Sequence, residues 1–557
     1  MDQMCMIEHL SNSVVGGTVT KEWNVWKAGE LEFTSAVEYR NPYLEGELTV
    51  MFRSPSGMNR RVKGFWDGGS RWLVRFAPDE EGIWSWWSVS SDMTNDGLYG
   101  RSGRFNVQPV SDQSSGPARH GFLRLHQSGR RFVHADGTPF FWLGDTVWSV
   151  SANATISEWL EYLKVRAEQG YTIAQINSMP QWDASVCIQR KPFVGVVNGN
   201  RQTYDFSQPF PEYFQTLDNM VEAAFEHGIL CAIVVLWFNY VEGTNLDWKV
   251  DLERHAIGAQ LARRYGEYLA ARYSAYGAIW LISGDTDAPV SVADPVYDAA
   301  ARGVLEGASG APLLTAHLHG GIATPESWNE KGWLGFHMFQ SCHFRDSVER
   351  AVKYAASDRA FLPARPVLNG EPVYDSIRFL DQGNSVNERA GREFVRHVAW
   401  VSILSGAAAG ITYGAHGLWP WHRTNEPYRQ VNYGLPLSWR EALDLPSGED
   451  MGILKRILTD FRWSDLKPET EIVQFIPDSG MVSARSPEGV VVVYFPDAPK
   501  EAIKLTIAVE SARWFCPETG QSSSAVREIG PPIVEIPAYP NEGDAVLILV
   551  MAGTENF

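Results

Sequence analysis

The feature that most constrains this chain is a long alternation between apolar runs of strand length and helical patterns, from residue 122 to residue 461. The strand-like runs include "TIAQINSM" at 172–179 and "ILCAIVVLW" at 229–237. Between the runs, apolar residues recur at helical spacing, as at 157–170 and 211–228. Because parallel strands need crossover connections that are usually helical, this order predicts an α/β fold.

The strand-like runs can be placed along the chain. They lie at 140–145, 172–179, 229–237, 278–285, 313–319, 333–341, 366–371 and 410–417. Eight strands alternating with helices predict a (β/α)8 TIM barrel over residues 122–461. The connection between the fifth and sixth runs is short and Gly-rich, which makes it the least regular step. A doubly wound open sheet is the alternative, but no GxGxxG motif follows the first strand.

Two β-rich regions flank the predicted barrel. Residues 18–110 contain "GELTVMFR", "RWLVRFAP" and "WSWWSVSS", separated by Gly, Pro, Asp and Asn, and this spacing predicts a β-sandwich. Residues 1–17 are expected to form an N-terminal tail, and the Ser/Gly/Pro-rich segment 111–121 a linker. Residues 462–557, with "VVVVYFP" and "DAVLILVMA", predict a small C-terminal β-domain.

Charge and composition exclude several classes of partner. The formal net charge is −18 and no run of Lys or Arg occurs, which argues against nucleic acid and against an anionic membrane surface. No apolar run reaches membrane-spanning length, and the N-terminal "MDQMCMIEHLSNS" lacks the features of a signal peptide. We therefore expect a cytoplasmic protein with no membrane partner, and the sequence leaves homo-oligomerisation open. The 5 cysteines are scattered without a CxxC pair, so they predict neither a zinc site nor a disulfide framework.

Two carboxylates stand at the ends of predicted barrel strands. Asp285 ends "IWLISGD" and Glu371 ends "PVLNGE", on the fourth and seventh strands, which face each other across the barrel mouth. A buried carboxylate costs free energy unless it is paired or used, and glycosidic bond hydrolysis needs two carboxyl groups around the anomeric carbon. Asp285 and Glu371 are therefore the predicted catalytic pair. Asp145 is a third candidate, whereas Glu426 in "HRTNEPYRQ" follows the eighth strand and is expected to be a loop residue.

Other polar and aromatic residues that end or follow the predicted strands are candidates for substrate binding. The sequence contains 22 Trp and 20 Tyr, and such rings stack on sugar faces, although large β-rich proteins also bury many aromatic residues. His317, Gln340 and His343 also fall at the predicted rim. The expected substrate-binding residues are Asp145, Trp148, Asn177, Trp182, Trp237, His319, His337, Tyr413, His416 and Trp419.

A metal site is the alternative for the rim histidines. His317 and His319 in "HLH", or His416 with His422, have ligand chemistry. Hydrolases of the amidohydrolase type carry an HxH motif at the end of strand one, where this chain has "GDTVW". We therefore expect no metal and no organic cofactor. No G-x-S-x-G elbow is present, which argues against a serine hydrolase.

Four segments carry a resemblance to a known family. The segments are "FFWLGDTVWSV", "IWLISGD", "PVLNGEPVYD" and "GITYGAHGLWPW". They resemble the signature strands of the apiosidase-like (β/α)8 glycoside hydrolases, glycoside hydrolase family 140 and its uncharacterised relatives. The N-terminal "EWNVWKAGELEFTS" is similar to the β-sandwich domain that precedes this barrel, and the C-terminal β-region is similar to a further domain in the same arrangement.

The resemblance implies a retaining mechanism with assigned residues. The acid/base falls on Asp285, in "SGD" where the family has a "GGD"-like motif, and the nucleophile falls on Glu371. Asp145 matches an aspartate that binds sugar hydroxyls, and "HLHGG" and "GAHGLW" match segments near the sugar.

The resemblance also suggests a substrate class. We expect an exo-acting hydrolase that releases a terminal pentose or furanoside, apiose- or arabinofuranose-like, from a short glycoside. The long loop at 180–210 is expected to shape the pocket. The alternatives are action on a pyranoside, or a non-catalytic carbohydrate-binding or scaffold protein on the same barrel.

Overall fold

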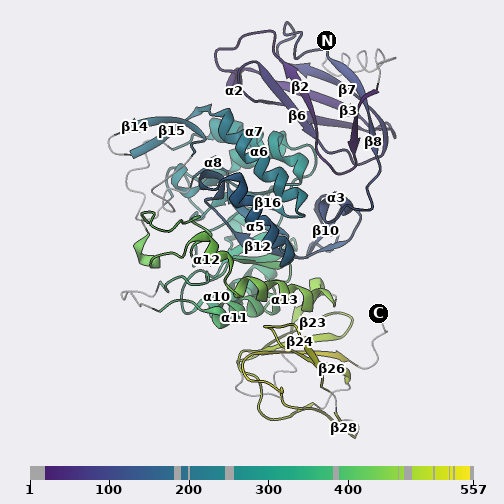
Figure 1. Ribbon diagram of the computed structural model, residues 1–557, viewed down its shortest axis with the longest axis vertical. Coiled ribbons are helices and arrows are strands. Elements are labelled where there is room, and N and C mark those ends of the chain that lie inside the picture. Colours follow the sequence, from purple (N-terminus) through teal and green to yellow (C-terminus); the bar gives the residue numbers. More distant parts are fainter. Residues whose placement is uncertain are drawn as a thin grey trace.

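The structure is a computed structural model, and it describes residues 19–180, 190–198, 201–244, 256–380, 388–428, 430–461, 463–469, 480–505, 509–525, 527–530 and 533–551. The predicted tail at 1–17 lies outside these residues. Three parts follow one another along the long axis: N-terminal strands, a central barrel and C-terminal strands (Figure 1). This arrangement confirms the predicted fold class.

The N-terminal part consists of two facing sheets. In strand β3 (Leu48–Arg53) every second side chain is buried, so one face of its sheet packs inward. Phe52 of β3 stacks on Phe76 of the opposite sheet, with 4.5 Å between ring centroids. One sheet contains, in order, β1 (Val19–Asn24), β8 (Ser102–Gln108), β7 (Gly82–Ser90), β3 and β4 (Asn59–Lys63), and the other β2 (Gly29–Thr34), β6 (Arg71–Phe76) and β5 (Phe65–Trp66). We call this part the N-terminal sandwich.

The central sheet has eight parallel strands in the order β18-β17-β16-β13-β12-β21-β20-β19. The ladder between β12 and β21 joins the first and last strands of the series, so the sheet curls into a nearly closed barrel. All residues of these strands are buried, which explains their continuous apolar runs. The strands are β12 (Trp142–Thr146), β13 (Ile173–Asn177), β16 (Leu230–Trp237), β17 (Ile279–Gly284), β18 (Leu314–Thr315), β19 (His337–Gln340), β20 (Val367–Glu371) and β21 (Gly410–Tyr413).

The barrel is interrupted between β18 and β19, its fifth and sixth strands. The short Gly-rich connection there forms only the four-residue helix α9 (Glu326–Asn329). Single hydrogen bonds replace a ladder: Gly335 N donates to Leu314 O at 2.8 Å, and Thr315 Oγ1 donates to Phe336 O at 2.6 Å.

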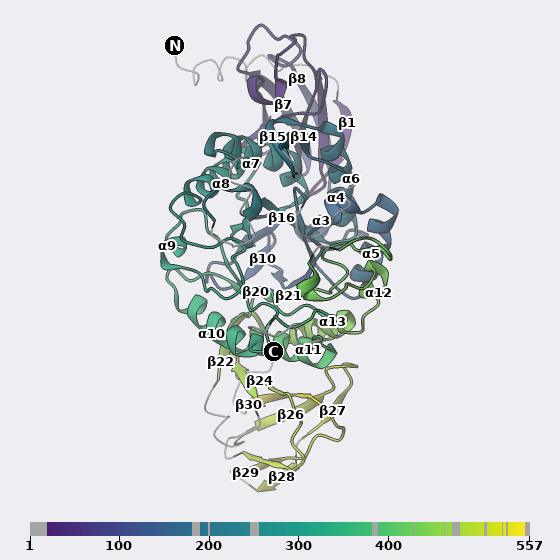
Figure 2. The same cartoon turned by 90° about the vertical axis from the view of Figure 1, so that its left-hand side faces the viewer.

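Helices surround the barrel (Figure 2). A capping box of Thr155 and Glu158 begins α5, and Pro211 occupies the first turn of α6. The surrounding helices include α5 (Ile156–Glu168), α6 (Pro211–Glu226), α7 (Ala259–Tyr273), α8 (Asp294–Gly307), α10 (Ser347–Ala360), α11 (Arg392–Leu404), α12 (Trp439–Leu443) and α13 (Ser447–Thr459).

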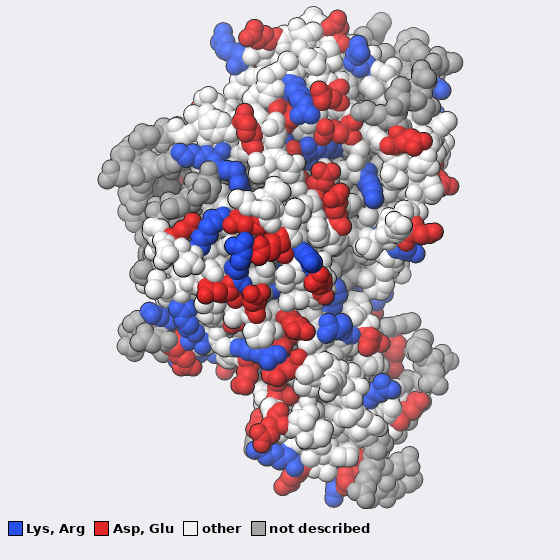
Figure 3. Space-filling model, in the orientation of Figure 1, with Lys and Arg blue, Asp and Glu red and all other residues white. Residues whose placement is uncertain are grey.

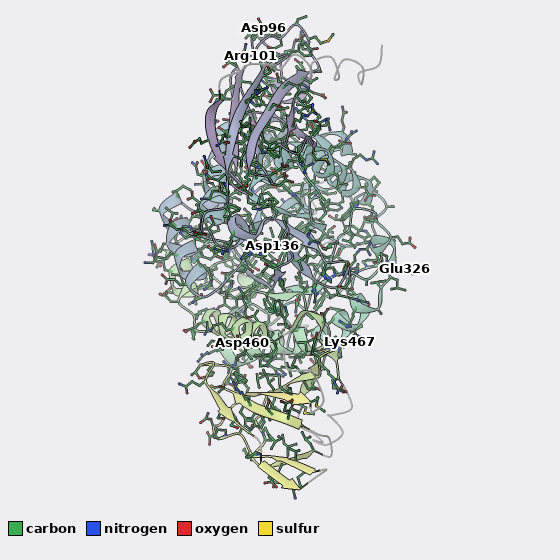
Figure 4. All side chains as sticks on the ribbon, turned by 90° about the vertical axis from the view of Figure 1, so that its right-hand side faces the viewer. Asp96, Arg101, Asp136, Glu326, Asp460 and Lys467 are labelled. Atoms are coloured by element: carbon green, nitrogen blue, oxygen red, sulfur yellow. The ribbon has the colours of Figure 1, made fainter. Side chains whose placement is uncertain are left out.

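A small sheet covers the N-terminal end of the barrel. Phe132 packs against Trp142 and Phe336 at the barrel floor, with ring centroids 6.0 and 5.1 Å apart. Asp136, in the turn after β10, lies near the centre of the barrel when that end faces the viewer (Figure 4). The sheet contains β9 (Leu123–Leu125), β10 (Phe132–His134) and β11 (Pro139–Phe140). Helix α3 (Pro117–His120) lies just before it, within the predicted linker.

The C-terminal strands dock on the barrel through α11. Arg396 of α11 binds Asp450 of α13 at 2.7 Å and Asp544, just before β30, at 2.7 Å. The larger sheet contains β22 (Lys467–Pro468), β23 (Val482–Arg485), β24 (Val490–Phe495), β30 (Ala545–Met551), β26 (Val509–Phe515) and β27 (Ser522–Ser524). The smaller one contains β25 (Ile503–Leu505), β29 (Ile533–Ile536) and β28 (Arg527–Gly530).

The described surface carries both signs of charge. Acidic and basic side chains are interspersed on the face in Figure 3. Among the described residues, no helix is both long and apolar enough to cross a lipid bilayer.

Candidate active site

Glu371, the last residue of β20, is held between two histidines. His317 Nε2 lies 3.3 Å from Glu371 Oε2, and His343 Nε2 lies 3.2 Å from Oε1. The two rings come from the segments after β18 and β19, so neighbouring strand ends bring them to the carboxylate. Glu371 is only 5% exposed, which makes these rings its main source of charge stabilisation.

The backbone orients both imidazole rings. Asp285 N donates to His317 Nδ1 at 3.4 Å, and Tyr374 N donates to His343 Nδ1 at 3.4 Å. In a neutral ring the proton then resides on Nε2, the nitrogen that faces Glu371. Burial raises the pKa of Glu371, but the two histidines more than offset it and lower that pKa to about 2. Glu371 is therefore an anion at neutral pH.

Asp285 lies directly after β17 and has the opposite electrostatic setting. Burial and the negative charge of Glu371 raise the pKa of Asp285 above its ordinary value. Gln340 Nε2, at the end of β19, donates to Asp285 Oδ1 at 2.8 Å. The Asp285 side chain is 20% exposed, so it is more accessible than Glu371. Two carboxyl groups with pKa values pushed apart are the usual arrangement for an acid beside a nucleophile.

The local backbone is adapted to this pair. Asp285 has φ 51° and Cys342 has φ 63°, in the left-handed region that non-glycine residues seldom adopt. Such residues concentrate at functional sites, where surrounding contacts hold the strained conformation. Glycine is required at Gly284, because a Cβ atom there would lie 2.1 Å from the Trp237 ring. Glycine at 284 therefore lets the Trp237 indole lie against the end of β17.

Three aromatic side chains pack around His317 and His343. Two of them, Trp148 and Trp237, are predicted sugar-binding residues, and the third is Tyr374. The Trp148 ring centroid lies 5.2 Å from that of His317, and the Trp237 centroid lies 6.0 Å from it. Trp148 Nε1 donates to Tyr374 Oη at 3.0 Å. Burial raises the pKa of Tyr374 well above its ordinary value, and the nearby Glu371 raises it further. Tyr374 therefore stays protonated beside Glu371, and the indoles form a rigid wall behind His317.

Several polar atoms at neighbouring strand ends are buried without a partner. Both side-chain polar atoms of Asn177, at the end of β13, have no hydrogen-bond partner among the described residues. The same holds for Trp237 Nε1, Asn239 Oδ1 and Thr146 Oγ1. Unpaired buried polar groups are rare, so a group of them at the C-terminal ends of β12, β13 and β16 has the character of a ligand site.

Trp419 and His416 form a further layer beside Tyr374. Trp419 Nε1 donates to His416 Nδ1 at 3.1 Å, and His416 Nε2 donates to Gly434 O at 2.9 Å. Burial lowers the pKa of His416 to about 3, so this ring is neutral. The Trp419 and Tyr374 rings are 6.3 Å apart. His319, by contrast, is partly exposed and close enough to Asp285 to lower the pKa of that carboxyl.

Asp145 and Tyr413 lie in the layer between the barrel and α5. Arg166 Nε donates to Asp145 Oδ2 at 2.6 Å and Tyr162 Oη donates to the same oxygen at 3.1 Å, with Asp145 and Arg166 completely buried. Tyr413 lies under the same guanidinium, 5.3 Å from ring centroid to Cζ, and its hydroxyl donates to Asp375. Asp145 Oδ2 and the Tyr413 hydroxyl are occupied by these contacts, whereas Asp145 Oδ1 is buried without a partner among the described residues. Because both side chains pack against Arg166, we leave them out of the candidate ligand contacts.

His337 and Trp182 are also not placed with the catalytic candidates. His337 begins β19, whereas Gln340, which binds Asp285, ends it. Its ring stacks on Phe361 at 5.5 Å, and burial lowers its pKa to about 3. His337 therefore belongs to the lower part of the barrel. Trp182 lies outside the described residues.

Sequence reasoning missed the partners of the carboxylates. The sequence places His317, Gln340 and His343 at the rim, and His317 also among the possible metal ligands, but none of the three is among the predicted site residues. Tyr374 lies three residues after Glu371 in "PVLNGEPVYD", and that spacing was its only signal. His317 here faces the two carboxylates. The described residues contain no group of three or more His, Cys, Asp or Glu arranged to hold a metal ion.

Comparisons with known proteins agree with this architecture. Residues 22–91 match a domain of unknown function, DUF5060. No curated protein matches the chain. A solved structure described as a glycoside hydrolase has 22% identity and a TM-score of 0.66, covering 80% of this chain and 100% of its own. A putative glycoside hydrolase from Bacteroides vulgatus has 17% identity and a TM-score of 0.70, covering 96% of this chain and 100% of its own.

At these identities the solved structures show a shared fold. The family assignment comes from the match to the apiosidase-like catalytic domain, which spans residues 126–465 and so covers more than half of the chain. Within that range lie the barrel strands and both carboxylates, Asp285 and Glu371. The chain therefore belongs to the apiosidase-like family, with the fold of glycoside hydrolases.

Proposed function

We propose that the protein is a retaining, exo-acting glycoside hydrolase in which Glu371 is the nucleophile and Asp285 the acid/base. The observation that carries this proposal is the contrast between the two carboxyl groups. Glu371 lies between His317 and His343, which favour its anion, whereas burial and Glu371 itself favour the protonated form of Asp285. A retaining glycosidase requires this pairing of an ionised and a protonated carboxyl group.

In the first step, a Glu371 oxygen attacks the anomeric carbon and forms a glycosyl ester. The bond from that carbon to the leaving oxygen breaks, and Asp285 gives its proton to this oxygen. In the second step, Asp285 takes a proton from water, whose oxygen attacks the anomeric carbon. The sugar leaves with its original anomeric configuration, and Glu371 is again a carboxylate.

The contacts of Asp285 suit its change of role. When Glu371 becomes an ester it loses its charge, so the main electrostatic cause that raises the pKa of Asp285 disappears. The Gln340 amide, 2.8 Å from Asp285 Oδ1, then stabilises the carboxylate that forms. Both changes favour Asp285 as a base in the second step. The two carboxyl groups suffice for this chemistry, so the proposal includes no metal or organic cofactor.

The proposed substrate is a short neutral glycoside with a terminal pentose or furanoside. The family match supports a sugar of the apiose or arabinofuranose kind. The unpartnered amide of Asn177 and indole N–H of Trp237 offer hydrogen bonds to sugar hydroxyls, and His319 lies beside Asp285. Trp148, which follows β12, and Trp237, which ends β16, are both buried and contribute the apolar wall.

A panel of 4-nitrophenyl glycosides tests this proposal. It would contain β-D-apiofuranoside, α-L-arabinofuranoside and matched xylo- and glucopyranosides, each assayed with and without a chelator. We expect turnover of at least one furanoside, unaffected by chelator and abolished in Glu371→Ala. Turnover of pyranosides alone would contradict the sugar class, and binding without turnover of any glycoside would contradict the enzymatic proposal.

A further inference from the structure

A β-hairpin after β13 packs against the rim of the barrel. It consists of β14 (Phe193–Asn198) and β15 (Arg201–Pro209), and we call it the rim hairpin. Rings of Tyr204 and Phe206 lie 5.9 and 6.0 Å from that of Tyr240. Tyr240 ends the short helix η1 (Phe238–Tyr240), which directly follows Trp237. The hairpin therefore supports the segment that carries Trp237 and Asn239 into the proposed sugar site.

The rim hairpin is also connected, through Tyr240, to the segment that directly follows Asn177. Tyr240 Oη donates to the carbonyl oxygen of Pro180, three residues beyond Asn177. Phe193 of the hairpin is fully buried, with ring centroids 6.0 Å from Phe214 of α6 and 5.4 Å from Tyr265 of α7. A shift of the hairpin would therefore move two of the segments whose unpartnered polar atoms face the proposed ligand.

The N-terminal sandwich contacts the other side of this hairpin. Helix α2 (Pro42–Glu45) of the sandwich lies next to β15 (Figure 1). Asn41 Nδ2 donates to Ser207 O of β15 at 2.9 Å, while Asn41 Oδ1 accepts from Leu44 N at 3.1 Å and caps α2. Tyr43 of α2 is fully buried, and its carbonyl oxygen accepts from Arg264 Nε of α7 at 2.7 Å. One short segment of the sandwich thus binds both the hairpin and the helix below it.

Buried ion pairs fix the sandwich on the barrel. Arg75 of the sandwich binds Asp218 of α6 at 2.6 Å, and Asp67 of the sandwich binds Arg272 of α7 at 2.8 Å. All four side chains are buried. Sliding the sandwich would break both of these buried pairs across the interface, although each side chain keeps a second partner on its own side: Arg75 pairs with Glu30, Asp67 with Arg71, and Asp218 with Arg272. The sandwich is therefore fixed against the barrel, and it holds α2 in a defined position next to the rim hairpin.

We propose that the N-terminal sandwich is a brace for the rim hairpin, so that the domain of unknown function at residues 22–91 forms part of the substrate-binding architecture. Asn41 is the positioning residue at the contact. The bracing itself stands on the contacts of Asn41, Tyr43 and Tyr240. Its effect on substrate binding rests on the proposed glycosidase function.

The test uses the full chain and three variants. Asn41→Asp keeps the oxygen that caps α2 and removes the N–H that binds Ser207 O. Asn41→Ala removes both. Gln108→Glu is the matched control, because it makes the same change from amide to carboxylate in the sandwich, at a residue whose amide N–H donates to Glu22 of the neighbouring strand β1. Melting temperatures establish that each variant is folded.

Hydrogen–deuterium exchange of the hairpin amides is the first measurement. We expect the β14–β15 amides to exchange about fivefold faster in Asn41→Asp, the effect of losing one neutral hydrogen bond, and to be unchanged in Gln108→Glu. Unchanged hairpin exchange in Asn41→Asp and Asn41→Ala would overturn the brace. This measurement does not depend on activity, so it stands even if the protein hydrolyses none of the glycosides tested.

Steady-state kinetics on 4-nitrophenyl α-L-arabinofuranoside is the second measurement. The brace predicts a KM raised about fivefold in Asn41→Asp with kcat nearly unchanged, because binding segments move while the carboxylates do not. Faster hairpin exchange with an unchanged KM would overturn the role in substrate binding. An equal fall in kcat and in melting temperature would also overturn it, since that result indicates a general loss of folded protein.

Discussion

His317 contacts both catalytic candidates: its Nε2 lies 3.3 Å from Glu371 Oε2, and its Nδ1 lies 3.9 Å from Asp285 Oδ1. The ring therefore links Glu371, whose pKa is lowered, with Asp285, whose pKa is raised by burial and by the charge of Glu371. Among the described residues, the groups near Glu371 include His317, His343, Tyr374, Asp285 and Cys342, and the two histidines are the ones that lower its pKa. Loss of either histidine should make Glu371 harder to ionise.

We predict that His317→Gln and His343→Gln move the acidic limb of kcat/KM to higher pH by about one unit. Glu371 must be ionised to attack, and its pKa of about 2 is held down by these rings, so their removal raises the pH at which activity is lost. The measurement is the pH dependence of kcat/KM on an activated aryl furanoside. His120→Gln, in α3 near the opposite end of the barrel, should leave the profile unchanged. An unshifted acidic limb in both rim variants would contradict this account of Glu371.

Asn177→Ala should lower kcat/KM about tenfold, chiefly through KM, while leaving the free energy of unfolding unchanged. Its amide has no partner among the described residues, so its removal breaks no internal hydrogen bond. Asn369→Ala is the contrast, because that amide bonds Ser341 and Ser402 and its loss should reduce stability. Denaturant unfolding and steady-state kinetics check the pair. A stability loss in Asn177→Ala with unchanged KM would indicate a structural role.

Asp145→Asn should destabilise the fold by about 3–5 kcal/mol and leave kcat/KM of the folded enzyme within about twofold. The change leaves the Arg166 guanidinium buried without its counter-ion. Glu161→Gln is the control: its pair with Arg440 is exposed, so its loss should cost less than about 1 kcal/mol. Urea unfolding measures both. A large loss of activity in a stable Asp145→Asn protein would contradict this account and indicate that Asp145 binds the sugar.

His337→Phe should stabilise the protein by about 1 kcal/mol at neutral pH, because both ring nitrogens are buried without partners among the described residues. The gain should grow as the pH falls. Between the ordinary pKa of 6.5 and the folded value of about 3, the unfolded chain binds a proton that the folded chain does not, so acid weakens the wild type. Unfolding at pH 7 and pH 5 tests this. Abolished hydrolysis in the stable variant would instead favour a sugar-binding role.

Much of the barrel could be predicted from the sequence because its strands are apolar throughout and end in polar residues. Asp285 and Glu371 are candidates on the basis of that pattern, and the structure places both at strand ends beside His317. The pattern of an apolar run that ends in a polar residue does not distinguish side chains that point into the barrel from those that point toward the surrounding helices. Trp142 bonds Thr412 inside the barrel, so Asp145, an odd number of residues further along the same strand, faces the helices instead.

Strand length and long-range contacts also lay beyond the sequence pattern. The apolar run at 333–341 predicts nine residues of strand, but β19 comprises only His337–Gln340, so His337 begins the strand. The contact of His343 with Glu371 depends on the path of a loop. No periodicity encodes such a path, and the partners of a carboxylate therefore needed the structure.

The central claim is that Glu371 forms a bond to the sugar, and the most direct test is mass spectrometry of Asp285→Ala during turnover of an activated aryl furanoside. This variant should complete the first step, which needs little proton donation, and then stall. The account predicts a peptide containing Glu371 that is heavier by one sugar residue, and azide should release a glycosyl azide of retained configuration. An unmodified Glu371 peptide, or a product of inverted configuration from the wild type, would contradict it.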